Sequence, residues 1–265
     1  MSTVDKALDI LDLFSDSRPA IGLSEIARLL KRDKASTLRY LNALESKGFV
    51  EQDTYTRSYH LGPALARLAL IREITYPVNR AARNILKKLV AETGETAHLS
   101  HVNGDSLTQI AIEETAFRGT RVYIDPAEPL SLHGTASGIA FLSRCAPARL
   151  ERFLARPLAR HTDNTPTEPA ALRALVEQAR RQGFARAEGT FEADVCGIAA
   201  PVFAASGQVC GAVAVATPNS RMTPETAARI AARVQEAARL ISRHYGASRL
   251  PDAAAPSPAR TKGRA

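Results

Sequence analysis

Residues 23–50 read LSEIARLLKRDKASTLRYLNALESKGFV, and this stretch predicts the fold of the N-terminal part of the chain. Ser24 is a good helix N-cap, and apolar residues follow it at the spacing of one buried helix face. Asp33 can cap the next helix, from about residue 34 to 47. Gly48 would end that helix, because helices commonly close on a left-handed residue. A short helix, a tight turn and a second helix predict a helix-turn-helix.

The helix over residues 34–47 has two predicted faces. Leu38, Leu41 and Leu44 share one side and would be buried, with Thr37 pointing near the core. Between Arg28 and Lys47 there are six basic and two acidic side chains. An ordinary amphipathic helix with a solvated face would also fit, but small, hydroxylated and basic side chains suit the DNA major groove. That opposite face carries Ser36, Arg39, Tyr40, Ala43 and Lys47.

The flanking residues extend this prediction in both directions. Apolar residues from Val4 to Phe14 predict a first helix, and strand-like runs at 49–51 and 59–61 joined by a polar loop predict a wing. We assign residues 1–62 to a DNA-binding domain and 63–77 to a helical linker. The candidate DNA contacts are Ser24, Arg32, Lys34, Ser36, Thr37, Arg39, Tyr40 and Arg57.

Residues 78–246 predict an α+β domain in which helices flank an antiparallel sheet. Runs at 96–102 and 107–112 flank Asn103-Gly104-Asp105, a strong hairpin signal. Further strands are expected at 122–124, 130–132, 184–185, 195–204 and 208–217, and helices at 136–143, 147–154, 171–182 and from 224 onward. Residues 247–265, rich in Ala, Pro and Arg, predict a disordered basic tail.

The composition of the whole chain sets limits on its class. With 265 residues, 45% hydrophobic and 23% charged, the chain is neither wholly disordered nor collagen-like. It shows no spanning segment and no signal-peptide layout, so we expect a cytoplasmic protein without a membrane partner. Three cysteines without CxxC spacing argue against a disulfide framework or a zinc site. The net charge of +8 suggests a polyanionic partner.

These residues resemble the IclR-type (isocitrate lyase regulator type) transcription factors over residues 4–243. The resemblance is carried by VDKALDIL at 4–11, LSEIA at 23–27, LESKGFV at 44–50 and YHLG at 59–62. In the second half it is carried by GETAHL at 94–99, LHGTASG at 132–138, RRQGFA at 180–185 and GIAAPVF at 197–203. It implies a winged helix-turn-helix joined by a helical linker to a GAF-like or PAS-like effector domain. It also implies operator DNA as the partner of a homodimer or a dimer of dimers.

The resemblance also implies an effector pocket around the turn at 133–137. A helix start has unpaired amide groups that suit a carboxylate, although a plain N-cap explains the same residues. This chain departs from the family because its cysteine before the IAAPV strand is displaced by one residue, and Ala214 and Ala216 stand where serines are common. We therefore expect a larger or more apolar organic acid. The candidate effector residues are Tyr123, His133, Gly134, Thr135, Ala136, Ser137, Asp194, Cys196, Gly197, Ala214 and Ala216.

Two other classes of function fit the sequence less well. An enzyme could use His98, His101 or His133 with Asp194 and Cys196, but no HExxH, GxSxG, Walker or GxGxxG pattern is present. His98 and His101 would lie on opposite faces of a regular strand, which disfavours joint metal binding. An interaction protein could use the arginines between 144 and 186, which more simply form a solvated face. We expect a ligand-responsive, sequence-specific DNA-binding transcription regulator of a catabolic operon, with no catalytic residues, cofactor or metal.

Overall fold

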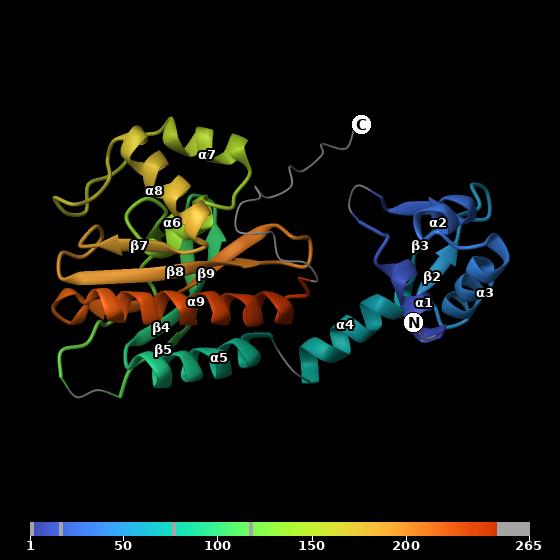
Figure 1. Cartoon of the computed structure of the whole chain (residues 1–265), viewed down its shortest axis with the longest axis horizontal. Coiled ribbons are helices and arrows are strands. Elements are labelled where there is room, and N and C mark those ends of the chain that lie inside the picture. The colour runs from blue at the N-terminus through green and yellow to red at the C-terminus, as the bar shows by residue number, and fades with distance from the viewer. Residues whose placement is uncertain (1–2, 16–17, 76–77, 117–118, 248–265) are drawn as a thin grey trace. The chain divides into compact units, whose positions relative to one another are not determined.

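The computed structural model describes residues 3–15, 18–75, 78–116 and 119–247, and these form two units (Figure 1). One unit extends to residue 77 and the other begins at residue 78. The predicted disordered tail, apart from Ala247, lies outside the described residues. Ala247 itself is buried and its amide donates to Ser242 O, so the folded part extends one residue further than predicted.

The first unit is a small helical domain with a three-stranded antiparallel sheet of order β1-β3-β2. Its core cluster takes apolar side chains from α1, β1, α2, α3, β2 and β3, among them Ile10, Ile21, Ile26, Leu41, Val50 and Tyr59. The hairpin β2–β3 follows α3 as a wing, as predicted, whereas β1 was not foreseen. The elements are α1 (Thr3–Leu11), β1 (Ala20–Gly22), α2 (Leu23–Leu29), α3 (Lys34–Glu45), β2 (Val50–Gln52), β3 (Ser58–Leu61) and α4 (Pro63–Thr75).

The predicted N-cap residue is correct for α3 but not for α2. The Asp33 carboxylate accepts a hydrogen bond from Ser36 N at 2.8 Å, and hydrogen bonding to Ser36 lowers the pKa of Asp33. Gly48 has a φ of +70° just beyond α3, as predicted. The N-cap of α2 is Gly22, so Ser24 is an exposed residue inside the helix and not its cap.

The buried face of α3 differs from the predicted one. Thr37, Tyr40, Leu41 and Leu44 are buried, while Leu38 is 38% exposed. Tyr40 is only 6% exposed and packs in the core, so it does not lie on the outer face where the sequence placed it. The true stripe follows positions i, i+3, i+4 and i+7, because the tyrosine ring supplies more apolar surface to the core than the leucine at 38.

The second unit is a six-stranded antiparallel sheet of order β6-β5-β4-β9-β8-β7, with helices on both faces. The hairpin predicted at 103–105 joins β4 to β5, and the Ala204–Gln208 turn joins β8 to β9. The elements are α5 (Val78–Thr93), β4 (Thr96–Asn103), β5 (Ser106–Glu113), β6 (Leu130–Ser131), α6 (Ala136–Leu142), α7 (Pro147–Leu154), α8 (Pro169–Gln182), β7 (Ala185–Glu188), β8 (Val195–Phe203), β9 (Val209–Pro218), a 3-10 turn η1 (Asn219–Arg221) and α9 (Pro224–His244).

The sheet separates two hydrophobic cores. On one face α5 and α9 pack against residues such as Leu99, Ile198 and Val213, and on the other α6, α7 and α8 pack against residues such as Leu107 and Ala199 (Figure 1). Residues 122–124 are not a strand, contrary to prediction. They lie in a loop between β5 and β6, and that loop reaches the face of the sheet that α6 covers. Among the described helices, none is long and apolar enough to cross a bilayer.

Candidate functional site

The outer face of α3 leaves several predicted DNA contacts free to meet a partner. Lys34 and Arg39 are exposed, and Ser36 is half-buried at the start of the helix. Thr37 is fully buried and its hydroxyl donates to Asp33 O at 2.8 Å, which makes it a part of the cap and not of the outer face. The Arg39 guanidinium lies 5.4 Å from the centre of the Tyr40 ring, so the buried tyrosine supports the exposed arginine.

Arg32 has a structural role that the sequence did not predict. Its guanidinium donates to Asp9 Oδ2 and to Lys6 O, both at 2.6 Å, and its side chain is only 15% exposed. The arginine therefore ties the turn before α3 to helix α1. Because Asp9 neutralises its charge and its side chain is largely buried, Arg32 is removed from the predicted set of DNA contacts.

The tip of the wing is a tight turn organised by Asp53. Its carboxylate accepts hydrogen bonds from Tyr55 N at 2.9 Å and from Thr56 N at 2.7 Å, and these bonds lower the pKa of Asp53. Arg57 is exposed and has a φ of +59°, a left-handed conformation that presents its side chain beside the tip. Tyr55 is 94% exposed at the same tip, and the sequence analysis did not select it.

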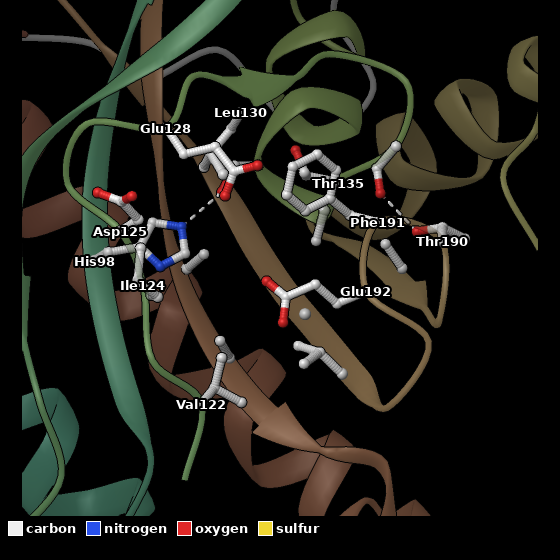
Figure 2. Close-up of a pocket in the computed structure, with 18 residues that line it drawn as sticks. His98, Val122, Ile124, Asp125, Glu128, Leu130, Thr135, Thr190, Phe191 and Glu192 are labelled. Atoms are coloured by element: carbon white, nitrogen blue, oxygen red, sulfur yellow. Dashed lines mark hydrogen bonds between the residues drawn. The ribbon is translucent and has the colours of Figure 1, made fainter. Parts of the chain in front are cut away.

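In the second unit, a cavity with an open mouth lies between the sheet and the start of α6 (Figure 2). The predicted residues Gly134, Thr135, Ala136, Ser137, Gly197, Ala214 and Ala216 all line it. The sequence analysis missed the remaining lining residues: His98, Val122, Ile124, Asp125, Glu128, Leu130, Ala187, Thr190, Phe191, Glu192 and Val195.

The floor of the cavity is open because small residues from three strands lie side by side. Ala187 pairs with Gly197, and Gly197 pairs with Ala216 across β7, β8 and β9. A Cβ atom on Gly197 would lie 3.2 Å from the Cβ of Ala136, so the glycine lets α6 begin close to the sheet. The alanines at 214 and 216 thus provide an apolar wall, as expected from the absence of serines there.

The start of α6 is held firmly in place. The Thr135 hydroxyl accepts from Gly138 N at 3.1 Å and donates to Ser131 O at 2.7 Å, and the Thr190 hydroxyl donates to Gly134 O at 2.6 Å. The amides of Ala136 and Ser137 begin the helix and have no carbonyl partner within it. Ala136 and Ser137 both line the cavity.

His98 is the most deeply buried titratable group of the cavity. It is 6% exposed, its Nε2 lies 3.2 Å from Ser137 Oγ, and its Nδ1 has no hydrogen-bond partner among the described residues. Burial lowers the pKa of His98 to about 4, so the imidazole is neutral at pH 7. A neutral imidazole beside a hydroxyl can offer a ligand either a donor or an acceptor.

A second, outer chamber adjoins the cavity and shares Val122, Asp125, Glu128, Glu192 and Val195 with it. The predicted residues Tyr123 and Asp194 line this outer chamber and not the inner cavity. Tyr123 is 65% exposed, which places it at the entrance. Among the described residues, no group of three or more His, Cys, Asp or Glu side chains is arranged to hold a metal ion.

Two predicted effector residues do not line either chamber. His133 Nδ1 lies 3.0 Å from Ser131 Oγ of β6 and its Nε2 lies 2.7 Å from Ala159 O in the loop after α7, so both ring nitrogens have partners within the protein. Cys196 is fully buried and shares its strand face with Ile198 and Ala200, which pack under α5 and α9. Because successive strand residues point to opposite faces, its one-residue displacement turns Cys196 away from the cavity and leaves Gly197 there.

Two family models match the chain. The description "IclR helix-turn-helix domain" matches residues 3–54, and "Bacterial transcriptional regulator IclR C-terminal" matches residues 74–243. The second match alone covers more than half of the chain.

Individual proteins agree with the family models. HTH-type transcriptional regulator BhcR of Paracoccus denitrificans is 34% identical over 240 residues, which are 90% of this chain and 85% of that protein. A crystal structure of an IclR transcriptional regulator from Silicibacter sp. TM1040 is 41% identical with a TM-score of 0.77, covering 96% of this chain and 99% of that one. An IclR homolog of Microbacterium hydrocarbonoxydans, crystallised with 4-hydroxybenzoate, has a TM-score of 0.58 at 24% identity, covering 93% and 100%. At that identity the likeness shows the fold alone.

A helix-turn-helix unit with an exposed basic α3 and an α+β unit with a cavity are both present, and both match the same family over most of their length. The chain therefore belongs to the IclR family and is a DNA-binding, ligand-responsive transcription regulator.

Proposed function

We propose that the protein regulates a catabolic operon for a small organic or aromatic acid, with α3 reading operator DNA and the cavity of the second unit binding the acid. The exposed Arg39 on α3 carries the first half of this proposal, because Arg is the commonest side chain to pair with guanine in the major groove. Ser24, Lys34 and Ser36 are suited to phosphate contacts, and Arg57 with Tyr55 at the wing tip can reach the backbone beside the groove.

The cavity supports an acid as the effector. A carboxylate at the start of α6 would meet the amides of Ala136 and Ser137 and the Ser137 hydroxyl, while the apolar floor would accommodate the carbon skeleton. Relatives include a Pca regulon regulatory protein of Pseudomonas putida, 26% identical, and KdgR of Escherichia coli, 27% identical. Their names favour a catabolic target without specifying the ligand of this chain.

Exposed apolar side chains on the first unit support a homodimer or a dimer of dimers. Large hydrophobic residues on α1 and α4 are exposed, and exposed apolar patches often mark a protein contact. Two helix-turn-helix units in a dimer would bind pseudo-palindromic half-sites. The residues are Val4, Leu8, Leu68, Leu70, Ile71 and Ile74.

The proposal also holds that the protein acts as a regulator and not as an enzyme. The cavity residues include a neutral histidine beside a serine, but none of the described hydrogen bonds links His98 to a carboxylate that could orient it as a base. The family assignment favours DNA as the partner, which in turn favours action in the cytoplasm.

Replacing Arg39 by alanine is expected to weaken operator binding by about 1 to 3 kcal/mol and to relax specificity at one base pair. The measurement is a gel-shift titration against the DNA flanking the protein's own gene and against single-base variants of it. Arg243→Ala, which removes an exposed charge from α9 of the second unit, is the control and should leave sequence preference unchanged. Unaltered affinity and preference in Arg39→Ala would refute the assigned role of α3, and no specific binding by the wild type would refute the function itself.

Filling the cavity is expected to abolish the response to the effector. In Ala216→Leu the larger side chain occupies the floor, so an acid that stabilises the wild type should lose its effect. A ligand at 100 times its Kd adds about 2.7 kcal/mol of stability, which a thermal-shift screen of small organic acids readily detects. Ala91→Leu, at an exposed position of α5, is the matched control. Equal thermal shifts in both variants would mean that the acid binds elsewhere.

A further inference from the structure

Most acidic side chains of the second unit form an ion pair with a basic side chain, but a few do not. Those that do lie 4.0 Å or less from an Arg or Lys, as Glu95 does from Arg221 and Glu151 does from Arg173. Six acidic side chains in the described part of this unit form no such pair: Asp125, Glu128, Glu168, Glu192, Asp194 and Glu225.

Two of the six have an evident structural role. Glu168 is the N-cap residue of α8, and Glu225 lies in the first turn of α9, where the helix dipole favours a negative charge. The other four line the cavity or its outer chamber. The unpaired negative charge of the unit is therefore concentrated at the candidate effector site.

The carboxylates reach the cavity from two separate loops. Asp125 and Glu128 come from the loop before β6, and Glu192 comes from the loop before β8. Figure 2 shows the Glu128 and Glu192 carboxylates on different sides of the same space. They also influence each other, because burial and the nearby charge of Glu128 both raise the pKa of Glu192. No Lys or Arg is among the residues lining the inner cavity, and Arg121 in the outer chamber pairs with Glu114 at 3.5 Å.

His98 gives an independent indication of a bound ligand. It lines the cavity and is 94% buried, and its Nδ1 has neither solvent access nor a hydrogen-bond partner among the described residues, so a small movement toward a bound ligand would satisfy it. The inner end of the cavity, with His98, Ser137 and the first amides of α6, offers hydrogen-bond donors to an anionic group. The mouth offers carboxylates and would repel a second anion.

We propose that the effector is an acid that also carries an amino group, with its carboxylate at the His98–Ser137 end and its ammonium group between Glu128 and Glu192. The inference rests on the proposed function, since it takes the cavity as the effector site. It adds that the effector must carry a positive charge. An ammonium group between Glu128 and Glu192 would neutralise the negative charge of these carboxylates, which no basic side chain in the described lining neutralises. These carboxylates are exposed at the mouth, so a purely anionic acid would enter past their negative charge without forming an ion pair with them.

The test compares acids that differ only in the amino group. Thermal shifts of the full chain would be measured with glycine and acetate, β-alanine and propionate, γ-aminobutyrate and butyrate, and phenylalanine and phenylpropionate, each at about 10 mM so that millimolar affinities are detected. The variants are Glu128→Gln, Glu192→Gln and the double variant, and Glu225→Gln is the control because it removes an unpaired carboxylate outside the cavity.

We expect at least one amino acid of the panel to raise the Tm while its amine-free partner does not. The double variant should bind that amino acid at least about tenfold more weakly, and Glu225→Gln should bind it as the wild type does. If an amine-free acid stabilises the wild type and the double variant binds it equally or more tightly, the proposal is wrong while the cavity remains the effector site. The proposal also fails if no amino acid of the panel raises the Tm. Failure of the proposed function would be seen separately, as the absence of specific operator binding.

Discussion

Gly138→Ala is expected to destabilise the second unit by about 3 kcal/mol, although alanine is the better helix former by about 1 kcal/mol. The reason is the close approach of α6 to the residues before it. A Cβ on Gly138 would lie 2.3 Å from Leu132 Cα and 2.4 Å from Leu132 O, distances at which the backbone itself must move. Urea unfolding followed by circular dichroism measures the loss.

The consequence of Gly138→Ala for the cavity follows from the same contact. Displacing α6 would move Thr135 and Ser137, so effector binding should weaken together with stability. The matched control is Gly22→Ala in the first unit, where no atom lies within 4 Å of the added Cβ and φ is −77°. We expect that control to change stability by less than about 1 kcal/mol. A Gly138→Ala protein as stable as the wild type would show that α6 does not depend on this contact.

Those parts of the fold that depend on neighbouring residues could be predicted from the sequence. The Asp33 cap, the left-handed Gly48 beyond the end of α3 and the hairpin at 103–105 all follow from residues within four positions of one another. The buried face of α3 could not be predicted equally well. Leu38 and Tyr40 are both apolar enough to be buried, and the choice between them depends on how α1 and the wing pack against the helix.

The candidate cavity shows the same division. Gly134 to Ser137 could be selected because a glycine followed by hydroxylated residues marks a helix start. Glu128 and Glu192 are 64 positions apart and come from loops, and no periodic pattern indicates that such loops meet. Arg32 illustrates the converse error, since its basic charge suggested DNA although Asp9 of another helix neutralises it.

The burial of His98 predicts a strong dependence of stability on pH. The pKa of His98 is about 4 in the folded protein and about 6.5 in an unfolded chain, so the unfolded state binds a proton that the folded state excludes. Stability should therefore fall as the pH drops from about 6.5 towards 4. The contribution of His98 is about 2 kcal/mol between pH 7 and pH 5 and about 3 kcal/mol in full.

Urea unfolding at pH 7 and pH 5 in wild type and His98→Gln isolates this contribution, since glutamine can keep a hydrogen bond with Ser137 but does not titrate. The wild type should lose about 2 kcal/mol more than the variant over that interval. His60→Gln, in the first unit, is the control, and the pH dependence of the second unit should persist in it.

Other groups also titrate in this range. They include Glu192 and two histidines, His101 and His161, whose pKa values are lowered by burial. These groups are present in both proteins, so their contributions cancel in the comparison. Identical losses in wild type and His98→Gln would mean that the cavity admits the proton, because water or a carboxylate such as Glu128 then solvates the charged imidazole.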